Sequence, residues 1–148
     1  MTDRETIAVA SDHAGYAMKE YAKRLLAERG FDVLDLGTDN EQSCDYPDYA
    51  HALASAIEDG RVRRGVAACG SGEGMAMTLN KHAAVRAALV WSPDIAEMTR
   101  RHNDANVLVL PGRYMSEAVA ADCIAAFLDT AFEGGRHQRR IEKMAVRH

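Results

Sequence analysis

The chain is poor in cysteine and proline, and it carries no large excess of charge. Its 148 residues include 3 Cys and 3 Pro, and 18 Lys and Arg stand against 22 Asp and Glu, for a net charge of −4. The cysteines lack Cys-x-x-Cys or zinc-type spacing, which argues against a disulfide framework and a structural metal. The charge balance gives no overall attraction to nucleic acid or to anionic membranes, so neither partner is expected.

Long hydrophobic runs are also missing. No stretch approaches the roughly 18 to 20 apolar residues that a membrane helix needs. Asp3, Arg4 and Glu5 interrupt the start of the chain before a signal-peptide core can form, and we therefore expect a cytoplasmic protein. The remaining composition, 47% hydrophobic and 27% charged, is typical of one globular domain with a buried core.

Short apolar runs alternate with amphipathic stretches. The predicted strands are 7–10, 31–36, 65–68, 87–90 and 106–110, and a helix is predicted after each of them. Ser92 with Pro93, and Ser116, fit the start of the last two helices. This alternation predicts an α/β/α sandwich of three layers, Rossmann-like, with a five-stranded parallel sheet in a single domain. The domain is predicted to span 1–133, and a basic helical tail, 134–148, to follow Gly134 and Gly135.

The carboxyl ends of parallel strands are where ligands bind in such sheets. Asp12 and His13 follow the first predicted strand, Cys69 the third, and Arg113 the fifth. The loop Gly70-Ser71-Gly72-Glu73-Gly74 lets backbone amides approach an anion. It lacks both the Walker and the GxGxxG spacing, so a nucleotide gains little support. A tight turn that needs only small residues explains the loop equally well.

The three cysteines differ in their surroundings. Cys69 begins the glycine loop, where nearby amides are expected to lower the pKa of its thiol below about 8.5 and make it a base or nucleophile. A small buried hydrophobe is the commoner role of a free cysteine, and Cys123, on an apolar helical stripe, fits it. Cys44 lies in a polar loop with no implied chemistry.

Basic and polar residues near the end of the chain allow two interpretations. His102 and Asn103 fall near the end of the fourth predicted helix, where a structural role is the default. Arg136 and Arg140 share a helical face and, with Arg113, are able to hold a phosphate. A solvated basic tail is the ordinary explanation of this pattern.

Five segments, taken together, resemble a known family. They are SDHAG (11–15), DYPDYA (45–50), CGSGEGM (69–75), RRHNDANVL (100–108) and FEGGRHQRRIEKM (132–144). In order and over nearly the whole chain they resemble ribose-5-phosphate isomerase type B. The resemblance implies a metal-free and cofactor-free interconversion of an aldose phosphate and a ketose phosphate through an enediolate, with ribose 5-phosphate and ribulose 5-phosphate as the leading pair.

The resemblance also implies roles for individual residues. Cys69 matches the base, Ser71 the hydroxyl beside it, Asp12 the carboxylate that moves protons between two sugar oxygens, and His102 the group that opens the sugar ring. The implied substrate-binding residues are His13, Tyr46, Gly70, Gly72, Gly74, Asn103, Arg113, Arg136 and Arg140. In the family the arginine tail crosses to a neighbouring subunit, which implies a homodimer or homotetramer with shared active sites.

Two departures leave the substrate open. One branch of the family uses a glutamate at the position of Met75, and this chain follows the cysteine branch. The segments 75–81 (MAMTLNK) and 82–85 (HAAV) differ from the commoner versions. Galactose 6-phosphate, allose 6-phosphate and a tetrose phosphate therefore stay as alternative substrates. A non-catalytic phosphate- or nucleotide-binding module is the alternative from another class.

Overall fold

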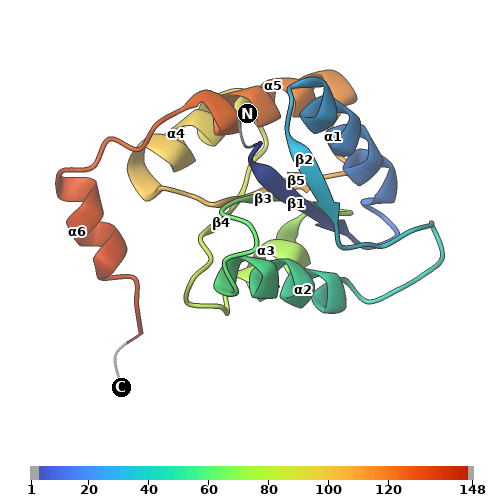
Figure 1. Ribbon diagram of the computed structural model, residues 1–148, viewed down its shortest axis with the longest axis horizontal. Helices are drawn as coiled ribbons and strands as arrows, with labels where there is room; N and C mark the ends of the chain where they lie inside the picture. The colour runs from blue at the N-terminus through green and yellow to red at the C-terminus, as the bar shows by residue number, and fades with distance from the viewer. Residues whose placement is uncertain (1–3, 147–148) are drawn as a thin grey trace.

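The computed structural model describes residues 4–146, in which strands and helices alternate (Figure 1). The elements are β1 (Thr6–Ser11), α1 (Tyr16–Glu28), β2 (Asp32–Asp35), α2 (Tyr46–Glu58), β3 (Gly65–Cys69), α3 (Glu73–Leu79), β4 (Ala87–Leu89), α4 (Pro93–Asn103), β5 (Val107–Pro111), α5 (Glu117–Asp129) and α6 (Arg136–Glu142). The predicted strands and the helices between them are confirmed. Among the described residues, no helix is both long and apolar enough to span a membrane.

The five strands form one parallel sheet in the order β2-β1-β3-β5-β4. Val9 of β1 lies opposite Asp35 of β2 on one side and opposite Val66 of β3 on the other. The chain passes from β1 to β2 in one direction and then crosses to β3 in the other. Ligands bind in the crevice that such a reversal leaves at the carboxyl ends of the strands. The fold therefore places the expected ligand-binding edge at the carboxyl ends of β1 and β3.

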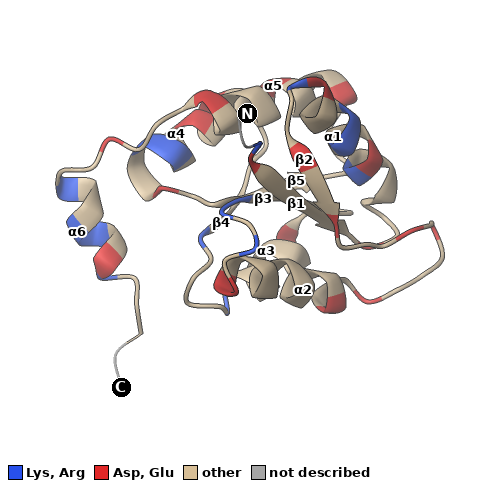
Figure 2. Ribbon diagram, in the orientation of Figure 1, with Lys and Arg blue, Asp and Glu red and all other residues tan. Residues whose placement is uncertain are grey.

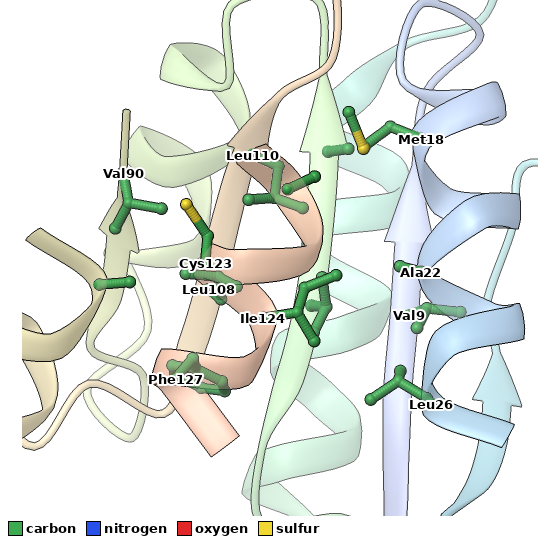
Figure 3. Close-up of a cluster of buried hydrophobic side chains, with 14 of the residues drawn as sticks. Val9, Met18, Ala22, Leu26, Val90, Leu108, Leu110, Cys123, Ile124 and Phe127 are labelled. Atoms are coloured by element: carbon green, nitrogen blue, oxygen red, sulfur yellow. The ribbon is translucent and has the colours of Figure 1, made fainter. Parts of the chain in front are cut away.

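Helices cover both faces of the sheet, as the sandwich prediction requires. Helices α1, α4 and α5 pack on one face over a cluster that includes Leu26, Leu108, Ile124 and Phe127 (Figure 3). Helices α2 and α3 pack on the other face over a second cluster, which includes Leu53. Full burial of one such side chain contributes about 1.5 to 3 kcal/mol, so the two clusters hold both helical layers against the sheet.

Two predicted helix caps and one predicted helix start are compared with the structure. The Ser116 hydroxyl accepts a hydrogen bond from the Val119 amide at 3.2 Å, which confirms this cap. Ser92 precedes α4, but within the described chain its side chain makes no capping bond. Helix α3 begins at Glu73, two residues earlier than predicted, because Gly72 adopts a left-handed conformation (φ 81°) and turns the chain directly into the helix.

Candidate active site

Asp12 is held where β1 meets α1. Its Oδ1 accepts a hydrogen bond from the Gly15 amide at 3.0 Å. A Cβ on Gly15 would lie 2.5 Å from the carbonyl carbon and oxygen of Ala68, the residue before Cys69. Only glycine therefore lets this turn approach the end of β3 so closely. The approach places the Asp12 carboxylate near enough to the Cys69 thiol for its charge to raise the thiol pKa.

Cys69 ends β3 and its side chain is only 4% exposed. Burial raises the pKa of the thiol above its usual value, while the amides of Met75, Gly72 and Gly74 hydrogen-bond to the sulfur and oppose the rise. The predicted lowering of this pKa is therefore wrong in sign. The loss of hydration by the thiolate raises the pKa more than the nearby amides lower it. The position of Cys69 in the sequence does not reveal how strongly it is buried.

The loop after Cys69 is tied to the loop after β5. The amides of Gly112 and Arg113 donate to the carbonyls of Cys69 and Gly70, each at 2.9 Å. The Arg113 side chain passes over Gly70, with its Cδ 3.4 Å from the position that a Cβ would take. This cross-connection fixes Arg113 beside the glycine loop, so the expected thiol, carboxylate and guanidinium share one edge of the sheet.

Each glycine of the loop has a close neighbour. A Cβ on Gly72 would lie 2.5 Å from Leu89 Cδ1, and one on Gly74 would lie 2.5 Å from the ring of Tyr46. Packing alone therefore requires small residues here, and the use of the loop amides as an anion cradle stays a prediction. The contact with Gly74 places Tyr46, at the start of α2, against the loop. The Ser71 hydroxyl accepts from the Glu73 amide at 3.2 Å, at the start of α3.

His13 is oriented by a residue to which the sequence assigned no chemistry. The Cys44 amide donates to His13 Nδ1 at 3.2 Å. A neutral imidazole that accepts at Nδ1 carries its hydrogen on Nε2, so Nε2 is left as a donor. Sequence reasoning missed this role of Cys44 because the contact uses its backbone amide. By contrast, Cys123 is buried on α5, where burial raises its pKa to about 11, and its interpretation as a packed side chain is confirmed.

The other predicted site residues lie at the opposite edge of the sheet. Helix α4 starts after the carboxyl end of β4 and runs back toward the amino ends of the strands, where it stops at Asn103. The Asn103 carbonyl accepts from Nε of Arg86 at 3.2 Å, and Arg86 directly precedes β4. Asn103 also lines a cleft of about 960 Å³ between α6 and the segment that leads into β4.

Helix α6 extends the chain from this second edge. The Glu133 amide donates to the Arg101 carbonyl at 3.1 Å, which ties the segment before α6 to the last turn of α4. Arg136 and Arg140 are exposed on α6, a basic helix that lies apart from the sheet at the left of Figure 2. The loop that carries Cys44 lies at the opposite end of the molecule in Figure 1.

A single chain therefore divides the predicted site residues into two groups. At the carboxyl edge are Asp12, His13, Tyr46, Cys69, Gly70, Ser71, Gly72, Gly74 and Arg113; at the amino edge are His102, Asn103, Arg136 and Arg140. The body of the sheet lies between them. The structure brings the thiol, Asp12 and Arg113 together, and it keeps His102 away from Cys69 of the same chain.

Comparison with known proteins agrees with this architecture. A profile described as Ribose/Galactose Isomerase matches residues 7–144. The chain belongs to the ribose/galactose isomerase family. It is 40% identical over 140 residues to Escherichia coli ribose-5-phosphate isomerase B. The match covers 95% of this chain and 94% of the relative. The resemblance found in the sequence is thereby confirmed.

Solved structures of the family share the whole fold. The ribose 5-phosphate isomerase of Thermotoga maritima is 44% identical, with a TM-score of 0.93, and the match covers 96% of this chain and 98% of that one. Ribose-5-phosphate isomerase B of Mycoplasma genitalium, solved with bound ribulose-5-phosphate, is 39% identical with a TM-score of 0.89 over 94% and 93% of the two chains. The α/β sandwich is thus the fold of the ribose/galactose isomerase family.

Proposed function

We propose that the protein interconverts ribose 5-phosphate and ribulose 5-phosphate through an enediolate. The observation that carries the proposal is the surroundings of the Cys69 sulfur. Backbone amides of Gly72, Gly74 and Met75 face it, and Asp12 lies beside it at the carboxyl edge of the parallel sheet. A base next to fixed hydrogen-bond donors is what proton removal beside a carbonyl requires. Relatives at about 40% identity that are named for this reaction add further support.

In the proposed mechanism the Cys69 thiolate removes the proton from C2 of the open aldose. The electron pair of that C–H bond moves into a C1–C2 double bond, and the charge develops on the C1 oxygen, where amides of the glycine loop stabilise it. The Asp12 carboxylate takes the O2 proton and gives a proton to O1. The thiol then returns its proton to C1, which completes the ketose without any net change in protons.

The rest of the carboxyl edge binds the sugar phosphate. Nε2–H of His13 and the guanidinium of Arg113 are suited to phosphate oxygens, because one donates a directed hydrogen bond and the other a charge-assisted pair. The Tyr46 ring forms a wall of the site over Gly74. Ser71, whose hydroxyl accepts from the Glu73 amide, is the hydroxyl expected to act beside the base.

We infer that the site is completed by a second copy of the chain. His102 and Asn103 lie at the amino edge, and Arg136 and Arg140 extend from it on α6. Because the sheet separates them from Cys69, they reach a Cys69 site only when two copies pair with the amino edge of one against the carboxyl edge of the other. The protein then works as a homodimer or a larger even assembly, in which the tail, 134–148, serves the partner's site.

Solvent deuterium exchange tests the proposed reaction. In D2O, ribose 5-phosphate is expected to yield ribulose 5-phosphate, and a hydrogen at C1 of ribulose 5-phosphate is expected to exchange for deuterium. Galactose 6-phosphate, allose 6-phosphate and a tetrose phosphate are run in parallel. Faster exchange with one of these sugars would move the substrate to another member of the family. Absence of exchange with every sugar, together with binding of a nucleotide, would contradict the isomerase proposal.

A further inference from the structure

Helix α6 meets the body of the protein through one buried imidazole. His137 is 6% exposed, whereas Arg136 and Arg140 on the same helix are exposed. The ring of His137 stacks on the ring of His102 with 4.3 Å between centroids and 12° between planes. Among residues 4–146, the buried Nε2 of His137 has no hydrogen-bond partner, and its contact with Glu133 Oε1 is long, at 3.5 Å. Stacking on His102, which lies on α4, therefore joins α6 to α4.

We propose that His137 is a positioning residue, which holds the His102 imidazole in the orientation that opens the sugar ring. This inference rests on the proposed function. A histidine near the end of a helix is free to take several rotamers unless a neighbour fixes its plane. His137 covers one face of the His102 ring and leaves its nitrogens at the edge, where a ring oxygen is reached. Misplacement of a catalytic group by about 1 Å is able to cost about 100-fold in rate.

The segment around His137 is built to hold this stack. Gly134 and Gly135 have φ values of 73° and 60°, so the chain turns sharply between the anchored Glu133 amide and α6. A helix of seven residues is marginal in water and needs a packing contact to persist. The stack supplies that contact, so the same side chain that orients His102 also fixes where α6 and its arginines stand.

The charge on His137 suits a supporting role. Burial, followed by the nearby His102 and Arg136, lowers the pKa of His137, so its ring stays neutral near pH 7. Glu133 acts in the opposite direction, and Arg140 adds to the lowering. A neutral aromatic face packs well against an imidazole and also attracts an imidazolium. The neutral ring of His137 is therefore suited to support His102.

A shared metal ion explains this cluster less well than stacking does. Ligand atoms of His102, Glu133 and His137 lie within 4.8 Å of one another. An imidazole binds a metal along its nitrogen lone pair, which lies in the plane of the ring. The planes of two rings stacked at 12° meet only far beyond the metal–nitrogen distance of about 2 Å, so one ring would have to leave the stack to share an ion.

A comparison of two reactions distinguishes a loss of His102 positioning from a general loss of activity. Isomerisation of ribose 5-phosphate needs ring opening. Exchange of a C1 hydrogen of ribulose 5-phosphate with D2O does not, because the phosphate on O5 prevents this ketose from forming a furanose. His137→Ala is expected to slow the isomerisation about tenfold or more beyond its effect on the exchange. His137→Phe keeps a stacked ring and is expected to restore most of the difference.

His82→Ala is the matched control. His82 also pairs with a histidine and a glutamate, at 2.7 Å from His51 and 2.9 Å from Glu58, and neither partner is a proposed site residue. For the His82→Ala variant, the ratio of the isomerisation rate to the C1 exchange rate is expected to equal that of the wild type. Equal losses in both reactions for His137→Ala, or no rescue by phenylalanine, would overturn the inference. His102→Ala, run in parallel, separates the two proposals. If His102→Ala slows isomerisation more than exchange and His137→Ala does not, only the role of His137 is contradicted. If His102→Ala slows both reactions equally, the roles of His102 and His137 are both contradicted.

Discussion

Isomerisation of ribose 5-phosphate falls by a factor of about 10³ when Cys69 is replaced by alanine, since removal of a positioned base typically costs between 10² and 10⁴. The C1 exchange of ribulose 5-phosphate falls by a similar factor, because both reactions require the same base to remove a proton from carbon. The fold is expected to persist, as a buried cysteine behaves as a small hydrophobe and its loss leaves only a small cavity. Steady-state rates and thermal unfolding check the two parts separately.

Cys123→Ala is the control for this prediction. Cys123 is also a buried thiol whose pKa is raised by burial, but it lies on α5 in the opposite helical layer. A similar loss of stability without a loss of activity is expected. Near-normal turnover by Cys69→Ala would reject the thiol as the base.

The raised pKa of Cys69 also sets the pH dependence. The base acts as thiolate, and its pKa lies above the usual value because burial disfavours the charged form. Below that pKa the thiolate fraction grows about tenfold per pH unit, so the C1 exchange rate in the wild type is expected to rise between pH 7 and 9. A rate that is flat over this range would mean that the proton goes to a group that is already ionised at neutral pH.

His102→Ala is expected to slow isomerisation of ribose 5-phosphate by about 100-fold and to leave the C1 exchange of ribulose 5-phosphate within a few-fold of the wild type. The reason is that ribose 5-phosphate arrives mainly as a closed ring, whereas the ketose is already open. Progress curves for both reactions, taken with the His82→Ala control, measure the difference. Equal losses in the two reactions would remove ring opening as the role of His102.

The fold was predictable because its signals are local. Short apolar runs and helical stripes predicted the strands and their parallel arrangement, since each pattern depends on neighbouring residues. The order of the strands was not predictable. The position of β5 between β3 and the edge strand β4 depends on packing between segments that are distant in the sequence. The glycine loop was found as a motif, but the close neighbours of Gly72 and Gly74 come from β4 and α2.

The site was predictable in its residues and less so in its geometry. Cys69 was identified as a candidate, but the sign of its pKa shift depends on how much water the folded chain removes. The orientation of His13 by Cys44 escaped detection because a backbone amide has no side-chain signature. His102 and Cys69 were expected in one site, and only the direction of α4 across the sheet reveals that one chain holds them at opposite edges.

Subunit complementation tests most directly whether two copies build each site. Cys69→Ala and His102→Ala are each expected to be nearly inactive on ribose 5-phosphate. In an equimolar mixture with free exchange, half of the dimers are hybrids, and each hybrid holds one site with both residues intact, so about a quarter of wild-type activity returns. Failure to recover activity, with hybrids demonstrated by native mass spectrometry, would show that Cys69 and His102 do not meet across two copies.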